Sequence, residues 1–306
     1  MMKVSKKIGA ALSAAALGLA MTACGGEETT TGNGGEEGAA QEGLGTITLG
    51  YVPAWADGLS TAWLLENQLT KIGYDVEMKS VGEVALVYQA VTTGDVSIYT
   101  SAWPEITHAS YMEKYGDDLE DLGTFYDNAK LTWAVPEYMD DVNSIEDLKG
   151  MADTFDGQVI GIEPSAGLTD VSLNSVFPKY GLGDEYELVT SSTTAMLAQL
   201  KKATDAEEPI VVTFWRPFWA NARFPVKELE DPKGALGEGE GMHFLGTKGF
   251  AEEFPEAAGW IEELELDDDE YGALEDMIVN QFEEGEEAEA VSAWIEKYLD
   301  VLPEIN

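Results

Sequence analysis

The sequence predicts an α/β fold with two lobes, each built on a mainly parallel sheet flanked by helices. Strand-like alternation and helical spacing of apolar residues follow one another along the chain, as in βαβ units. A second set of strands and helices interrupts this rhythm before the first set is completed, which gives two crossings between lobes. The 306 residues, 44% of them hydrophobic, are enough for two separate cores.

The first lobe is expected to comprise residues 46–137 and 236–306. Its strands are recognised by alternation and its helices by apolar residues three or four positions apart. The expected elements are strands at 46–52, 74–78, 96–99 and 130–135 and helices at 59–72, 84–91 and within 250–298.

The second lobe is expected to span residues 138–235. The run Ser144-Ile145-Glu146-Asp147 looks like a capping box that opens a helix, so the first crossing is placed near residues 136–143. The remaining expected elements are strands at 159–162, 186–189 and 210–212, helices from 167 and at 193–202, and a return segment at 225–232.

The N-terminus predicts export and a lipid anchor. Lysines at positions 3, 6 and 7 precede an apolar run over residues 8–21, which is typical of a signal peptide at residues 1–23. The run Leu19-Ala20-Met21-Thr22-Ala23-Cys24 resembles a bacterial lipobox, in which Cys24 would be lipidated. An ordinary signal peptide with a chance cysteine is the alternative. The Gly- and Glu-rich residues 24–45 are then expected to form a disordered tether.

The charge of the chain excludes one class of partner. There are 17 basic and 58 acidic residues, a net charge of −41, so nothing here would neutralise the phosphates of a nucleic acid. The acids are spread over nearly the whole chain, as on the surface of a protein from a salt-rich environment, where salt screens self-repulsion. An alkaline habitat is the alternative explanation.

Tryptophans beside strand ends are the main functional signal. Trp55, Trp103 and Trp215 follow or end expected strands, and Trp219 is the alternative to Trp215. Indole faces attract a quaternary ammonium, a cation without N–H groups that hydrogen bonds cannot hold. Single tryptophans are more often core residues, but three such positions in both lobes favour an aromatic box.

These segments together resemble the glycine betaine binding proteins of ABC importers, over essentially all of residues 46–306. The resemblance is carried by Trp55 with Leu59-Ser60-Thr61, by residues 101–108 (SAWPEITH), 142–149 (VNSIEDLK) and 160–168 (IGIEPSAGL), and by the Trp215 to Trp219 segment. It implies a periplasmic-binding-protein fold of type II-like architecture, with two hinge crossings.

The resemblance also implies the ligand contacts. Trp55, Trp103 and Trp215 would surround the trimethylammonium group, while His108 and the backbone amides of Gly167 and Leu168 would hold the carboxylate. The start of a helix suits an anion. Arg216, one of only two arginines, is expected to form a structural ion pair.

No catalytic set is present in the sequence. Two histidines, His108 and His243, and a single cysteine leave no zinc motif and no Cys–His nucleophile, so neither an enzyme nor a metal or cofactor is expected. A secreted carbohydrate-active lipoprotein is the remote alternative, because tryptophans also stack on sugars. A sugar site would need polar groups around the rings, whereas the donors here lie at one end.

The resulting prediction is a monomeric solute receptor for osmoprotectant uptake. It would capture glycine betaine between the lobes and deliver it to an ABC permease driven by a cytoplasmic ATPase. The lipid anchor would hold it at the outer face of the cytoplasmic membrane, in the periplasm if an outer membrane exists. Choline, proline betaine, carnitine and ectoine are alternative ligands.

Overall fold

The computed structural model describes residues 43–305, so the predicted signal peptide, Cys24 and the tether up to residue 42 lie outside the described residues. Within the described part, eight of the nine strands form one continuous path of pairing, in the order β2-β1-β3-β9-β4-β7-β5-β6, and the ninth, β8, pairs with β4. The strands are β1 (Thr46–Tyr51), β2 (Asp75–Ser80), β3 (Ile98–Ala102), β4 (Leu119–Pro136), β5 (Gln158–Ile160), β6 (Glu187–Val189), β7 (Val212–Arg216), β8 (Val226–Glu228) and β9 (Glu240–Thr247).

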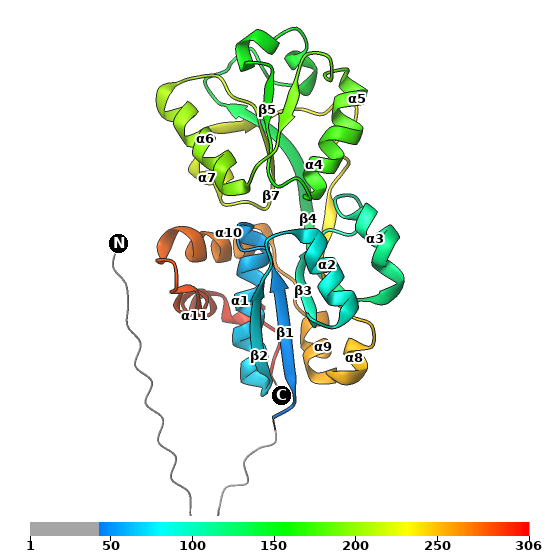
Figure 1. Ribbon diagram of the computed structural model, residues 1–306. Coiled ribbons are helices and arrows are strands. Elements are labelled where there is room, and N and C mark those ends of the chain that lie inside the picture. The colour runs from blue at the N-terminus through cyan, green and yellow to red at the C-terminus, as the bar shows by residue number, and fades with distance from the viewer. Residues whose placement is uncertain (1–42, 306) are drawn as a thin grey trace, which may run out of the picture. The chain divides into compact units, whose positions relative to one another are not determined.

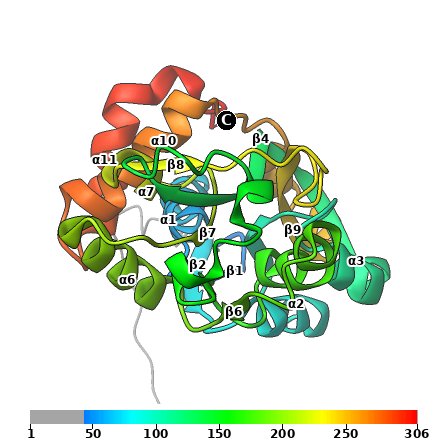
Figure 2. The same cartoon turned by 90° about the horizontal axis from the view of Figure 1, so that it is seen from above.

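Helices flank these strands on both sides, and both views place α6, α10 and α11 on one side and α2 and α3 on the other (Figures 1 and 2). The α-helices are α1 (Ala56–Ile72), α2 (Val84–Thr93), α3 (Ala109–Tyr115), α4 (Gly167–Val171), α5 (Phe177–Tyr180), α6 (Thr193–Ala206), α7 (Ala220–Arg223), α8 (Phe250–Glu253), α9 (Pro255–Glu262), α10 (Asp268–Asp276) and α11 (Glu287–Tyr298). The short helical turns are η1 (Gly116–Asp118), η2 (Ile145–Leu148), η3 (Ala152–Phe155), η4 (Ser172–Val176), η5 (Met277–Gln281) and η6 (Leu299–Val301).

The long strand β4 joins the two lobes (Figure 1). Its first part, as far as Ala129, pairs with β9, and from Lys130 onward it pairs with β7. We call β1, β2, β3, β9 and the first part of β4 the sheet of the first lobe, and the rest the sheet of the second lobe. The chain therefore crosses once inside β4 and once between β8 and β9. The expected lobe boundaries at 137/138 and 235/236 stay a prediction.

The α/β class is confirmed, and the sheets are mixed rather than purely parallel. Strand β1 runs parallel to β2 and β3, and β5 runs parallel to β6 and β7, as the alternating pattern indicated. Strands β4 and β9 supply the antiparallel pairs. The sequence pattern missed β8, β9 and the first part of β4, whereas the strand expected at 130–135 is the second part of β4.

Local sequence accounts for the ends of several elements. Gly94 ends α2 in the left-handed conformation (φ 77°), which a glycine adopts without strain. The predicted capping box is present: Ser144 Oγ accepts from the Glu146 amide, and the Asp147 carboxylate accepts from the Ser144 amide at 2.9 Å. It opens only the short turn η2 rather than a longer helix.

Four of the eight tryptophans are packing residues. Trp133 and Trp294 are completely buried, Trp260 is nearly so, and each indole N–H has a hydrogen-bond acceptor, while Trp63 is half-buried against the core. In Trp133, Trp260 and Trp294 the apolar body of the ring is buried and its N–H group is hydrogen-bonded.

Candidate functional site

One cavity between the two lobes brings together all six residues expected to bind the ligand. The space inside it that the centre of a water-sized sphere can occupy is about 30 Å3. The first lobe contributes residues that follow β1 and β3, and the second lobe contributes β7 and the segment that leads from β5 into α4. The lining residues are Trp55, Asp57, Trp103, Thr107, His108, Leu131, Ile162, Ala166, Gly167, Leu168 and Trp215.

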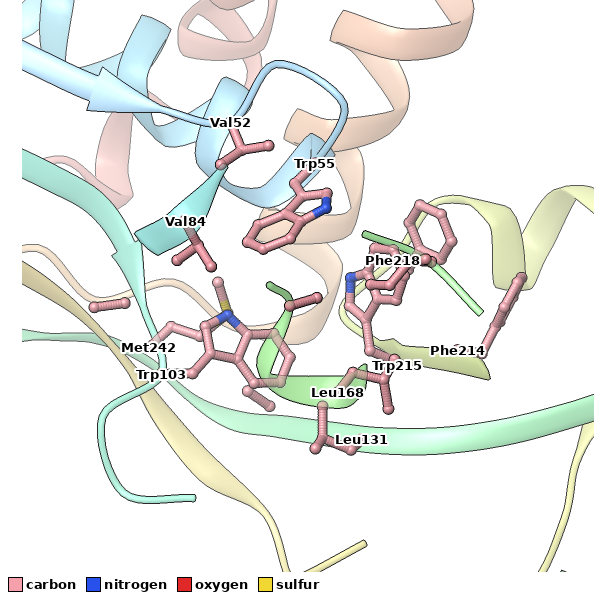
Figure 3. Packing of buried hydrophobic residues seen from close by; sticks show 14 of the residues in the cluster. Val52, Trp55, Val84, Trp103, Leu131, Leu168, Phe214, Trp215, Phe218 and Met242 are labelled. Carbon is pink, nitrogen blue, oxygen red and sulfur yellow. The ribbon is translucent and has the colours of Figure 1, made fainter. Parts of the chain in front are cut away.

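Three indoles surround this space (Figure 3). Trp55 immediately precedes α1, Trp103 follows β3, and Trp215 lies on β7; they are 7%, 4% and 5% exposed. The N–H groups of two are used elsewhere, since Trp55 Nε1 donates to Glu163 Oε2 at 3.0 Å and Trp103 Nε1 donates to Asp57 Oδ2 at 3.2 Å. Hydrogen bonds from the ring N–H groups therefore fix the orientation of Trp55 and Trp103.

The structure distinguishes Trp215 from Trp219. Trp215 lines the cavity and stacks on Phe218, with ring centroids 3.9 Å apart and planes at 14°. Trp219 is not a lining residue; its ring meets Phe218 edge-on at 5.7 Å, and its amide donates to Glu275. Phe218 thus fixes the plane of Trp215, and Trp219 packs behind it.

His108 presents a neutral imidazole to the cavity. Its side chain is buried, and the Trp103 amide donates to Nδ1 at 3.0 Å. Burial lowers the pKa of His108 to about 3, so the ring is uncharged at neutral pH. Because Nδ1 accepts a hydrogen bond, the ring hydrogen lies on Nε2, which is available as a donor.

Gly167 and Leu168 begin α4, and the helical path continues through η4 and α5 to Tyr180. The first amides of a helix have no acceptor within it, and in residues 43–305 those of Gly167 and Leu168 have no other acceptor either. A Cβ at Gly167 would lie 1.9 Å from the Thr107 carbonyl oxygen of the first lobe. A side chain at this position would therefore prevent the contact between the two lobes.

Asp57 is a lining residue that the sequence analysis missed. It is 3% exposed, and its Oδ1 has no hydrogen-bond partner among the described residues. Burial raises the pKa of Asp57 to about 6, so at neutral pH the carboxylate is mostly ionised. It places a negative charge beside the indoles. Its position in the first turn of α1, two residues after Trp55, was the available signal, hidden among 58 acidic residues.

The other charged groups considered from sequence lie elsewhere. Arg216 is not a lining residue and forms an ion pair with Glu228, as expected. His243 bonds to Asp121 and Glu105. In residues 43–305 no group of His, Cys, Asp and Glu has a geometry that would hold a metal ion. No helix in that range combines the length and apolar character needed to span a membrane.

Comparison with known proteins places this arrangement in a family. Residues 45–297 match the family OpuAC, described as the substrate binding domain of ABC-type glycine betaine transport system. A glycine betaine/L-proline-binding protein (ProX) of Borrelia burgdorferi has a similar structure, with a TM-score of 0.78, 32% identity, and coverage of 85% of this chain and 97% of that one. Lactococcal OpuAC, solved in a closed form with glycine betaine, has a TM-score of 0.76 and 30% identity, covering 83% and 96%.

Two further proteins are similar over a shorter length or at lower sequence identity. The glycine betaine/carnitine transport binding protein GbuC of Listeria monocytogenes is 32% identical over 155 residues, so the match spans half of each protein. An ABC-transporter choline binding protein in complex with choline shares the fold, with a TM-score of 0.73, 22% identity, and coverage of 83% and 89%. Since the family match covers most of its length, the chain belongs to the family of substrate binding domains of ABC-type glycine betaine transport systems.

Proposed function

We propose that the protein is an extracytoplasmic receptor that binds glycine betaine in the cavity between its lobes and delivers it to an ABC permease. The observation that carries this proposal is the set of groups that line one cavity: three buried indoles, a buried carboxylate, and uncharged N–H donors. A zwitterion with a methylated cation at one end and a carboxylate at the other can use both kinds of group.

The cationic end is assigned to Trp55, Trp103, Trp215 and Asp57. A trimethylammonium offers methyl groups rather than donors, so indole faces and an unpaired carboxylate oxygen satisfy it where hydrogen bonds would not. Three desolvated cation–π contacts are worth about 2 kcal/mol each. Apolar contact between the methyl groups and the indole rings adds to the binding free energy at this end of the ligand.

The carboxylate end is assigned to His108 Nε2–H and the amides of Gly167 and Leu168. Hydrogen bonds to a charged acceptor contribute about 1.5–3 kcal/mol in favourable geometry. Together with the cage this is comparable with the roughly 8 kcal/mol of micromolar affinity once ordering costs are considered. A neutral histidine keeps this donor unchanged across the physiological pH range.

Choline is the second candidate, and a specific observation favours it. The Asp57 carboxylate, with its unpaired oxygen, would balance a full positive charge better than a zwitterion needs. Choline lacks a carboxylate, however, and would leave the donors at the other end without an anion. The names of the more similar relatives, which refer to glycine betaine, support the first candidate. Proline betaine and carnitine carry the same two charged groups as glycine betaine and differ from it in the atoms around them.

Lipid anchoring through Cys24, a monomeric state and a position on the outer face of the cytoplasmic membrane belong to the same proposal. The anchor and the location are supported by the basic and apolar N-terminal sequence that ends at the chain's single cysteine. Mass spectrometry of the protein from a membrane fraction tests the anchor, since lipidation would add acyl chains to a chain that begins at Cys24.

Calorimetric titration of glycine betaine, choline, proline betaine and carnitine at low and at high salt tests the ligand. We expect glycine betaine to bind most tightly, with an affinity nearly independent of salt because the cavity is shielded from the solvent. Absence of heat with millimolar glycine betaine under both conditions would remove the assignment. Choline binding as tight as that of betaine would instead contradict the role of the N–H donors.

A further inference from the structure

Glu163 links the two lobes through a wall of the cavity. It lies between β5 and α4 in the second lobe and is 6% exposed. Its Oε2 accepts the indole N–H of Trp55, from the first lobe, at 3.0 Å. Its two carboxylate oxygens also accept the amide and the hydroxyl of Thr193, both at 2.9 Å, within the second lobe.

The backbone around Glu163 is held in place as well. Its carbonyl accepts from Thr169 Oγ1 at 2.8 Å and from the Ala166 amide at 3.1 Å, which shapes the turn before Gly167. Among the described residues Glu163 has no basic partner. Three donors and the start of the fourteen-residue helix α6 compensate its charge instead. The carboxylate is thereby fixed in position whether or not the first lobe is near.

The bond from Trp55 depends on contact between the lobes, whereas those from Thr193 do not. If the lobes separate, Trp55 Nε1 exchanges Glu163 for water and its ring loses one of its fixed edges. Other bonds between the lobes, such as Tyr111 Oη to the Ser165 carbonyl at 2.8 Å, do not involve a ring of the cavity. The Trp55–Glu163 bond therefore couples lobe contact directly to the orientation of a wall of the cavity.

From this geometry we propose that Glu163 is a positioning residue that holds Trp55 against the ligand and sets how long the closed, ligand-bound state lasts. The inference rests on the proposed binding function. Since the bond exists only after the lobes meet, its loss affects ligand release rather than capture. Loss of a hydrogen bond to a charged acceptor corresponds to an increase of about 10- to 100-fold in the dissociation rate of the ligand.

Stopped-flow tryptophan fluorescence on the Glu163→Gln variant tests this. The Thr193 amide can only donate, so the glutamine oxygen would face it in the Oε1 position. The glutamine nitrogen would then donate to the Thr193 hydroxyl and face the Trp55 N–H, from which it cannot accept. We expect the dissociation rate of glycine betaine to rise by about 10-fold or more, with an association rate within about threefold of the wild type. The matched control is Thr193→Val, which removes one bond within the second lobe and leaves the Trp55 contact; its dissociation rate should stay within about threefold.

A measurement on the wild-type protein tests the same role without depending on the folding of the variant. With 15N-labelled indoles, the Trp55 Nε1–H should be protected from exchange with water in the presence of glycine betaine and unprotected in its absence. Equal protection in both states, or a Glu163→Gln dissociation rate within about threefold of the wild type, would overturn the role of Glu163. If the wild type does not bind glycine betaine, the proposed function and the role of Glu163 are both overturned. If the wild type binds normally and the variant behaves like it, only the role of Glu163 is overturned.

Discussion

Replacement of Asp57 by asparagine should stabilise the ligand-free protein at neutral pH and weaken cation binding. The side chain is fully buried, and its pKa is raised from 3.8 to about 6. A tenfold change in proton affinity corresponds to about 1.4 kcal/mol, so the ionised carboxylate costs about 3 kcal/mol of folding free energy at pH 7. Asparagine has nearly the same shape and keeps an oxygen to accept from Trp103 Nε1.

The sign of the effect gives it a distinctive pH profile. Because the pKa is higher in the folded state, folded protein binds more protons than unfolded protein between about pH 4 and pH 6, and stability from Asp57 is lost as the pH rises through that interval. The variant lacks this loss. The difference in unfolding free energy between Asp57→Asn and the wild type should therefore grow from near zero at pH 4 to about 3 kcal/mol at pH 7.

Urea denaturation of both proteins at several pH values measures that difference. Groups that do not interact with Asp57 cancel in the comparison, whereas buried Glu275, whose pKa the Asp57 charge helps to raise, contributes to it. Asp118→Asn, which removes an exposed carboxylate, controls for the change in net charge. A difference that does not vary between pH 4 and pH 7 would refute the argument from burial. With ligand present the order should reverse, because the methylated cation stabilises the charged carboxylate; the affinity for glycine betaine should fall at least about 10-fold in the variant.

Three other substitutions probe the remaining parts of the cavity by calorimetry. His108→Ala should weaken glycine betaine binding about 10- to 100-fold and leave choline binding within about threefold, because only betaine carries a carboxylate; equal losses would contradict the donor role. Gly167→Ala should reduce affinity by more than about 100-fold, since the new methyl group would meet Thr107, whereas Gly183→Ala, where nothing lies within 4 Å, should have no effect. Trp215→Ala should cost at least about 30-fold in affinity and Trp219→Ala much less; the reverse order would make Trp219 the third wall.

Local patterns in the sequence predicted most of the parallel core. Strand β1, helices α1 and α2 and strand β3 were found because alternation and helical spacing depend on neighbours in the chain. The first part of β4 and strand β9 were missed because their sequences are rich in glycine and charged residues and their pairing contains register shifts. These strands form because distant segments pair, and no local period encodes that pairing.

The same distinction applies to the cavity. The tryptophans and the residues at the start of α4 stand at the ends of recognisable elements, so the sequence indicated where they would lie. The carboxylates of Asp57 and Glu163 did not stand out, because their roles depend on which indole N–H each one meets across the fold. In a chain with 58 acidic residues, only burial distinguishes these two from the solvated majority.

Burial also separates the two uses of negative charge in this protein. Most of the acids are on the surface, where salt near 1 M reduces the screening length to about 3 Å and removes most of their influence on a ligand. Asp57 and Glu163, at 3% and 6% exposure, lie where mobile ions do not reach. Under the proposed function, a receptor with a strongly acidic surface can therefore keep its affinity for a methylated cation as the salt concentration changes, because the charges assigned to the cation and its cage are those that the solvent does not screen.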